Sequence, residues 1–234
     1  MTDEEIFRHI DHTLLKAVSS WAEIEKLCDE AIDCKTASVC VPPSYVKPIS
    51  SVYGKALNIC TAIGFPLGYS VKDAKLLEAG IALDHGASEI DMVINLGDVK
   101  NGAFDFVEEE ISAVKKTVGD KILKVIVETC YLTTEEKIRL CEIVTRAGAD
   151  YIKTSTGFGT AGAALPDVLL FKENIGPMVK IKAAGGVKTR EDLEMFISSG
   201  CERVGTSSAV KLLRGARGAR GAGGAGGAGE PYES

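Results

Sequence analysis

The sequence predicts a single α/β domain folded as a (β/α)8 barrel, also called a TIM barrel. Short apolar runs that resemble buried strands alternate with amphipathic, helix-like segments up to about residue 213. Eight such pairs follow one another without a large insertion, and 234 residues suffice for one barrel. An open doubly wound sheet is the alternative, and the even spacing of the eight units favours the closed barrel.

The expected strands are short runs rich in apolar residues, bounded by polar, glycine or proline residues. They occupy residues 8–15, 36–41, 57–66, 88–95, 121–129, 150–156, 178–186 and 201–208. The expected helices are 20–33, a short one after 42–43, 70–85, 103–118, 134–147, one from 165, 189–199 and 207–213. Ser19 or Ser20 can cap the first helix, and Thr133 with Glu136 resembles a helix start.

Composition and charge argue against several functional classes. The net charge is −6 and basic residues do not cluster, so we expect no nucleic-acid partner. No apolar run approaches the roughly 18 residues that cross a membrane. The acidic residues 1–10 lack the features of a signal peptide. We therefore expect a cytoplasmic protein without a membrane partner.

The cysteines and histidines do not suggest a disulfide framework or a metal site. Seven cysteines are present, their number is odd, and no CxxC motif occurs, which favours reduced, buried thiols. The three histidines form no pair with metal-ligand spacing. No metal is expected.

The composition changes after Leu213 to a run of glycine, alanine and arginine. This run has little side chain to bury, so we expect a barrel domain over 1–213 and a flexible, low-complexity tail over 214–234. The arginines of the tail could contact an acidic partner, but a solvated linker is the simpler interpretation.

Lys153 interrupts one of the expected strands with a charged side chain. Burying an ammonium costs several kcal/mol unless partners compensate. Either this strand lies at an edge, with the lysine in solvent, or the lysine is functional. Similar polar side chains lie in the other expected strands: Asp11, Cys40, Asp91, Lys124, Glu128 and Lys182.

Three lysines inside one barrel would lower one another's affinity for protons. If Lys124, Lys153 and Lys182 all face inward, at least one pKa should fall toward neutrality. A neutral amine can attack a carbonyl to form a Schiff base, while Asp91 and a second lysine move protons through water. A salt-bridged structural core is the alternative interpretation.

Glycines and serines after the last strands suggest a second site. The GxGxxG run of Gly157, Gly159 and Gly162 follows the sixth strand and lacks the acidic residue of a dinucleotide fingerprint. Loops after strands seven and eight commonly bind phosphate in such barrels. The candidates there are Gly185, Gly186, Gly205, Ser207 and Ser208. Tight turns and helix capping are the alternative.

Eight motifs in order resemble the deoxyribose-phosphate aldolase family over about residues 8–213. They are IDHTLLK, ASVCVPP, IGFPLG, EIDMVIN, LKVIVETC, YIKTSTGFGT, KAAGGVKT and RVGTSS. The resemblance implies a TIM barrel and the reversible cleavage of 2-deoxy-D-ribose 5-phosphate to acetaldehyde and D-glyceraldehyde 3-phosphate. It also implies a lysine Schiff base, no cofactor and no metal, and a homo-oligomer, either a dimer or a tetramer.

The resemblance assigns roles to residues at matching positions. Lys153 is the Schiff-base lysine, Lys182 lowers its pKa and shuttles protons, and Asp91 is the proton-relay carboxylate. Asp11 and Lys124 are further polar members of the site. Cys40 lies near the substrate, where an aldehyde could modify it. Residues on the phosphate-binding loops are Gly157, Gly185, Gly186, Ser207 and Ser208.

The chain departs from many relatives at a few positions, and two other functions stay open. Ala17 replaces a frequent proline, and Ala161 replaces a frequent glycine near the phosphate loop. Tyr232 is near the C-terminus, where some relatives use a terminal tyrosine in proton transfer. A transaldolase-like Schiff-base enzyme and a non-catalytic barrel that binds sugar phosphates are the alternatives.

Overall fold

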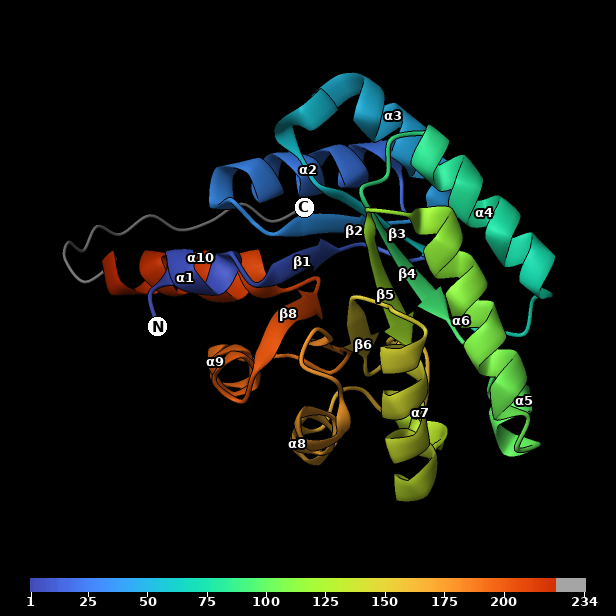
Figure 1. Ribbon diagram of the computed structural model, residues 1–234. Coiled ribbons are helices and arrows are strands. Elements are labelled where there is room, and N and C mark those ends of the chain that lie inside the picture. The colour runs from blue at the N-terminus through green and yellow to red at the C-terminus, as the bar shows by residue number, and fades with distance from the viewer. Residues whose placement is uncertain (222–234) are drawn as a thin grey trace, which may run out of the picture.

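The eight expected strands form a closed parallel barrel in the order β1 to β8, which confirms the predicted fold (Figure 1). The structure is a computed structural model that describes residues 1–221. Residues 222–234, which include Tyr232, lie outside the described part. The strands are β1 Ile10–Thr13, β2 Ser38–Val41, β3 Ile59–Ile63, β4 Glu89–Val93, β5 Ile122–Ile126, β6 Tyr151–Lys153, β7 Lys180–Ala184 and β8 Cys201–Thr206.

The helices surround the barrel (Figure 1). Those expected are α2 Trp21–Cys34, α3 Pro43–Tyr53, α4 Lys72–Asp84, α6 Phe104–Val118, α7 Thr134–Arg146, α8 Leu165–Asn174, α9 Arg190–Ser198 and α10 Ala209–Gly221. The short helices α1 Asp3–Phe7 and α5 Leu96–Lys100 were not expected, nor were the 3-10 turns Gly54–Ala56 and Thr129–Tyr131. Among residues 1–221, no helix has both the length and the apolar character needed to cross a bilayer.

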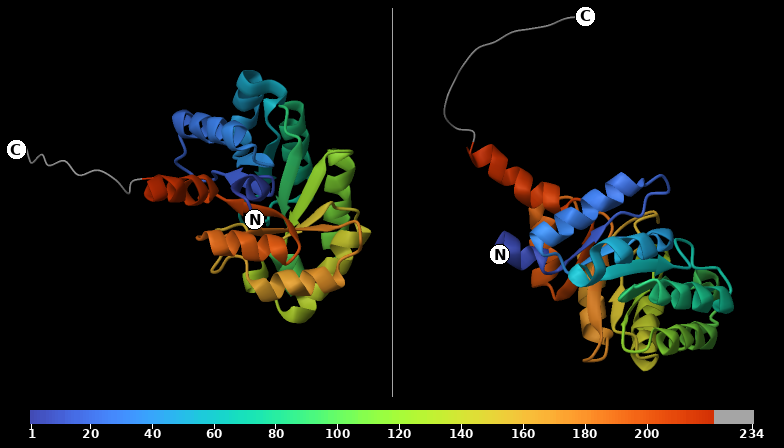
Figure 2. Two further views of the ribbon diagram at one scale, coloured as in Figure 1. Left: turned by 90° about the vertical axis from the view of Figure 1, so that its left-hand side faces the viewer. Right: turned by 90° about the horizontal axis from the view of Figure 1, so that it is seen from above.

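Local sequence signals account for several helix boundaries. Ser20 and Thr133 each form a capping box with the glutamate three residues later, as the sequence predicted. Residues 214–221, expected to begin the tail, continue α10. Figure 2 shows α10 pointing away from the body of the barrel. The division into a barrel domain and a tail stays a prediction.

The two faces of the strands bury different kinds of side chain. Outward-facing residues such as Ile90, Val125 and Ile152 are apolar, fully buried and part of the hydrophobic core. Their neighbours Asp91 and Lys124 point the other way, because successive side chains in a strand alternate. The interior of such barrels is usually filled with branched apolar residues. Here the interior contains buried charged residues, which indicates a functional site inside the barrel.

The apolar layer between barrel and helices should supply most of the stability. Ile111 on α6 is fully buried, whereas Ile81 on α4 is 45% exposed. We expect Ile111→Ala to lower the free energy of unfolding by about 2–5 kcal/mol, because a cavity replaces packed atoms. Urea unfolding should show Ile81→Ala, the matched control, close to the unmodified protein. Equal losses in the two variants would contradict this picture of the core.

Candidate active site

Three lysines converge on one carboxylate inside the barrel. Lys153 Nζ and Lys182 Nζ both donate to Asp91 Oδ2 at 2.7 Å, and Lys124 Nζ donates to Asp91 Oδ1 at 2.9 Å. Asp91, Lys124 and Lys182 are fully buried, and Lys153 is 3% exposed. Lys153 is therefore an interior lysine and not an exposed lysine of an edge strand.

Strand register explains why these side chains meet. Asp91 on β4 lies opposite Lys124 on β5, and Lys153 on β6 lies opposite Lys182 on β7. Because all four occupy inward positions of a closed barrel, they meet near its axis. The sequence pattern correctly grouped these four residues, although it could not supply the distances between them.

A deeper layer of charge supports this group. Asp11 on β1 is 2.5 Å from Lys182 Nζ, and Glu89 on β4 is 2.5 Å from Lys124 Nζ. The Arg203 guanidinium, on β8, donates to Asp11 Oδ1 and, at 2.9 Å, to Glu89 Oε1. Asp11 was among the predicted site residues, whereas Glu89 and Arg203 were not. Glu89 lies two residues before Asp91, so strand alternation could have placed it on the same face.

Carboxylates dominate the electrostatics of Lys124 and Lys182. Burial acts to lower the pKa of Lys182, but the carboxylates of Asp11 and Asp91 outweigh it and raise that pKa. The pKa of Lys124 is likewise raised well above its ordinary value, chiefly by Asp91 against the effect of burial. The fall expected for at least one lysine pKa therefore does not occur at Lys124 or Lys182, because their carboxylate partners outweigh both burial and the repulsion between the lysines.

The carboxylates respond in the opposite sense. Burial acts to raise the pKa of Asp91, yet the ammoniums of Lys124, Lys153 and Lys182 outweigh it and hold that pKa well below its usual range. Burial also opposes ionisation of Asp11, and Lys182, Lys124 and Arg203 together lower its pKa. Both aspartates are therefore ionised at neutral pH.

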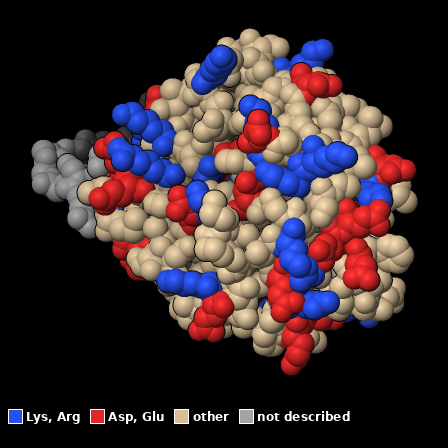
Figure 3. Space-filling model, in the orientation of Figure 1, with Lys and Arg blue, Asp and Glu red and all other residues tan. Residues whose placement is uncertain are grey.

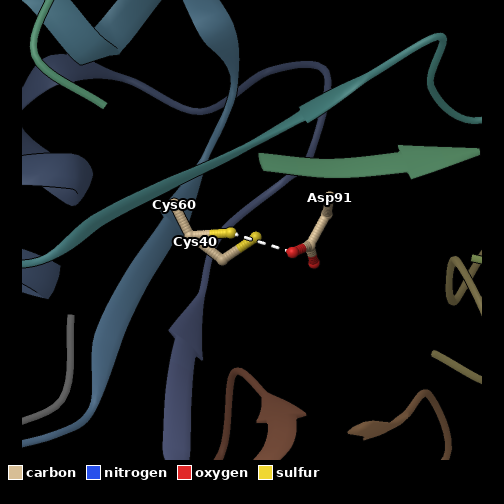
Figure 4. Close-up of side chains that lie close together, drawn as sticks. All are labelled: Cys40, Cys60 and Asp91. Carbon is tan, nitrogen blue, oxygen red and sulfur yellow. Dashed lines mark hydrogen bonds between the residues drawn. The ribbon is translucent and has the colours of Figure 1, made fainter. Parts of the chain in front are cut away.

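Two thiols lie beside Asp91 (Figure 4). Cys40 lies opposite Cys60 in the β2–β3 pairing, and Cys60 Sγ donates to Asp91 Oδ1 at 3.1 Å. The neighbouring Cys60 thiol lowers the pKa of Cys40, while burial raises the pKa of Cys60. Cys40 was predicted near the site and Cys60 was not. The three side chains offer ligand atoms close together, but a metal would have to displace ammoniums that already hold both oxygens of Asp91.

A cavity of about 300 Å³ opens above Lys153 at the carboxyl ends of the strands. Its wall includes five predicted residues of the phosphate loops: Gly157, Gly185, Gly186, Gly205 and Ser207. Lys16 and Thr206, which were not predicted, also line it. Lys153 is the single lysine of the Asp91 cluster on this wall. The cavity therefore gives a ligand access to Lys153 while Lys124 and Lys182 stay behind it.

The glycines of the cavity wall have specific roles. Gly157, Gly185 and Gly186 have positive φ values of 88°, 80° and 76°, which side chains rarely adopt. Gly205 leaves room for Lys182, because an added Cβ there would lie 3.1 Å from Lys182 Cε. Gly185 and Gly186 thus shape the backbone of the cavity, whereas Gly205 also allows close packing beneath it.

Ser208 and Glu128 are not on the cavity wall and instead stabilise its loops. The Ser208 hydroxyl is 2.9 Å from the Thr206 hydroxyl and donates to the Val187 carbonyl at 3.3 Å. Glu128 shares the alternation of Lys124, but β5 ends before it and its φ is 53°. Its carboxylate accepts from the Thr156 hydroxyl and backbone N–H. Glu128 thus anchors the loop after β6.

Basic and acidic side chains are mixed over the face drawn in Figure 3. That face has no continuous basic surface of the kind that binds nucleic acid.

Comparisons with known proteins agree with the barrel fold. A sequence profile of the DeoC/LacD family aldolases matches residues 6–219. The chain belongs to this aldolase family. This aldolase is similar to the deoxyribose-phosphate aldolase of Clostridium botulinum, with 63% identity over 215 residues that cover 92% of this chain and 97% of the relative. It is also similar to the deoxyribose-phosphate aldolase of Clostridioides difficile, with 55% identity over 211 residues and 90% and 96% coverage.

A solved structure has the same fold. The deoxyribose phosphate aldolase of Aeropyrum pernix superposes on this aldolase with a TM-score of 0.84 and 32% identity, and the match covers 92% of each chain.

Removing the shared carboxylate should destabilise the protein in a pH-dependent way. We expect Asp91→Asn to lower the free energy of unfolding at pH 7 by about 3 kcal/mol or more, because three buried ammoniums lose their partner. The Asp91 pKa is lower in the folded state, so its stabilising effect is present above the unfolded pKa of about 3.9. That effect is lost as the pH falls further toward the folded pKa. Urea unfolding at several pH values measures the difference.

Asp33→Asn is the control for this variant, because Asp33 is 69% exposed and 3.9 Å from Arg214. It should change stability little at any pH. A difference between Asp91→Asn and the unmodified protein that does not depend on pH would contradict the electrostatic account.

Proposed function

We propose that this aldolase reversibly cleaves 2-deoxy-D-ribose 5-phosphate to acetaldehyde and D-glyceraldehyde 3-phosphate, with Lys153 as the Schiff-base nucleophile. The observation that carries the proposal is the position of Lys153, whose amine touches Asp91 and also borders the cavity. The names of the Clostridium botulinum and Clostridioides difficile relatives support the choice of substrate.

Cleavage follows from the chemistry of a bound imine. The Lys153 amine adds to C1 of the open-chain aldehyde, and loss of water gives an iminium. The C2–C3 bond then breaks, its electrons pass into an enamine, and the C3 hydroxyl proton passes to a base. D-glyceraldehyde 3-phosphate leaves. Protonation of the enamine at C2 and addition of water release acetaldehyde and restore the amine.

Asp91 and Lys182 are suited to move the protons of these steps. Asp91 Oδ2 lies 2.7 Å from both lysine amines, so a proton that leaves Lys153 has an acceptor at hydrogen-bonding distance. Asp91 is fully buried, so transfer from the C3 hydroxyl requires a solvent molecule between them. Lys182 donates to the same oxygen, so a proton can pass between Lys182 and the Lys153 side of the cavity through Asp91. Asp11, Lys124 and Cys40 complete the surroundings without contacting the cavity.

The glycine-lined end of the cavity is suited to hold the 5-phosphate. Backbone N–H groups of loops with positive φ commonly bind phosphate, and the N-terminus of α10 follows Ser207 and Ser208 directly. Lys16, which also lines the cavity, supplies a cation. With Lys153 at the other end, the cavity would orient the aldehyde carbon toward the amine.

Assembly and location are part of the same proposal. A homo-oligomer, either a dimer or a tetramer, in the cytoplasm is the expected state; the Aeropyrum pernix relative is named as a tetramer. Sedimentation of the purified protein measures the oligomeric state.

Reductive trapping tests the nucleophile. Incubation with acetaldehyde and cyanoborohydride should attach an ethyl group to Lys153, and peptide mapping by mass spectrometry should locate it there. Lys153→Met should lose the adduct and more than about a thousandfold of the cleavage rate, since the covalent route is gone. Lys100→Met, on the surface near Glu136, is the control and should behave like the unmodified protein. An adduct on Lys182 would overturn the assignment, and no adduct at all would favour a non-catalytic binding protein.

A second variant tests the phosphate end of the cavity. Ser207→Asp places a negative charge beside the proposed phosphate site. We expect KM for 2-deoxy-D-ribose 5-phosphate to rise roughly tenfold or more, because like charges repel. The rate with unphosphorylated 2-deoxyribose serves as the internal control and should change much less. A similar loss with both sugars would place the phosphate elsewhere.

A further inference from the structure

The buried charges of the barrel do not balance. Among the described residues, the connected interior network contains four basic groups, Lys124, Lys153, Lys182 and Arg203, and three carboxylates, Asp11, Asp91 and Glu89. If every group were ionised, one positive charge would be left without a carboxylate. A net charge in a low-dielectric interior is unfavourable, so burial favours the loss of one proton from the network.

The arginine cannot be the group that releases it. A guanidinium stays protonated in proteins, whereas a buried lysine amine readily becomes neutral. The Arg203 side chain is 11% exposed and is held by Asp11 and Glu89. The missing proton must therefore come from one of the three lysines.

The carboxylate partners distinguish the three lysines. Lys124 Nζ lies within 4 Å of Glu89, Asp91 and Asp11, at 2.5, 2.9 and 3.6 Å. Lys182 Nζ has two partners, Asp11 at 2.5 Å and Asp91 at 2.7 Å.

Lys153 has a single carboxylate partner in this network. That partner is Asp91 at 2.7 Å, through the oxygen that Lys182 also uses. Deprotonating Lys153 therefore breaks the fewest favourable ion pairs.

We propose that Arg203 and Glu89 are positioning residues that set the number of protons held by the lysine cluster, with Arg203 forcing Lys153 into the neutral form that attacks the substrate. This inference rests on the proposed role of Lys153. Neither residue borders the cavity, so both act through Asp11, Lys124 and Asp91.

The other groups around Lys153 do not cancel the excess charge. Those packed against the site are Cys40 on β2, Cys60 on β3, Glu128 after β5, Tyr151 on β6, and Lys16 after β1. Burial raises the pKa of Cys60 and of Tyr151, so both stay neutral. The Glu128 carboxylate accepts hydrogen bonds from Thr156 and makes no ion pair with the three lysines, and Lys16 is exposed, where solvent screens it. Cys40 and Glu128 are the two groups that could still supply a compensating negative charge, and each needs its own variant.

The test is the pH dependence of Schiff-base formation. The full protein is incubated with acetaldehyde and cyanoborohydride between about pH 5 and 10, and the midpoint of the trapping rate is measured. Arg203→Met removes the excess charge and should move the midpoint upward by about one pH unit. Glu89→Gln adds to the excess and should move the midpoint downward by a similar amount. If Arg203→Met does not fold, the direction of the Glu89→Gln shift decides alone.

Four control variants separate the effect of charge from the effect of side-chain shape. Arg203→Lys keeps the charge and should restore the midpoint of the unmodified protein, even if its rate is lower. Arg146→Met removes a surface arginine paired with Glu108 and should leave the midpoint unchanged. Cys40→Ser and Glu128→Gln should also leave it unchanged. A downward shift in either variant, like that of Glu89→Gln, would place a compensating negative charge on the replaced residue and overturn the proposal.

Failure of this inference can be distinguished from failure of the proposed function. If the unmodified protein forms no adduct at any pH, Lys153 is not a Schiff-base nucleophile. If it forms the adduct but Arg203→Met and Glu89→Gln leave the midpoint in place, or shift it in the same direction, the charge count does not control the amine.

Discussion

The site depends on one carboxylate that three lysine amines share. Asp91 holds Lys124 through one oxygen and both Lys153 and Lys182 through the other. A buried ammonium without a partner would be strongly destabilising, so these lysines can lie together only because Asp91 lies between them. The same carboxylate is the nearest proton acceptor to Lys153. Structural cohesion and proton transfer therefore depend on the same pair of oxygen atoms.

Closure of the barrel is what turns this contact into a site. The Lys182–Asp11 ion pair joins β7 to β1, which lie on either side of β8 in the closed barrel. In an open sheet with β1 and β8 at opposite ends, Lys182 and Asp11 would be far apart. A register shift between Ile181 and Lys182 brings Arg203 opposite Lys182. Lys124 and Lys182 are each held by carboxylates on β1 and β4, and Lys153 is held by Asp91 on β4, so the three amines have little freedom to rotate apart.

Strand alternation in the sequence was enough to predict which lysines and aspartates share the barrel interior. It could not predict features that depend on how different strands and loops pack together. It placed Asp91, Lys124, Lys153 and Lys182 together, because a charged residue within an apolar run is conspicuous. Arg203 was missed because it follows the exposed Glu202 in a less apolar run, and its burial depends on the register shift in β7–β8. The raised pKa values of Lys124 and Lys182 were also missed, since they follow from distances to carboxylates on other strands. The Ser208 contact with Val187 likewise depends on how two loops pack.

The composition of the interior is easier to explain by chemistry than by stability. Replacing buried ion pairs with apolar side chains often leaves a protein as stable or more stable, and barrels of this kind usually fill their interiors that way. A network of seven ionisable groups is therefore a costly choice for a purely structural core. Its position supplies the reason: Lys153 lies where the network meets the cavity, while Lys124 and Lys182 are sealed beneath it. A carbonyl compound that enters the cavity meets one amine, and in the proposed account the charges behind that amine govern whether it carries a proton.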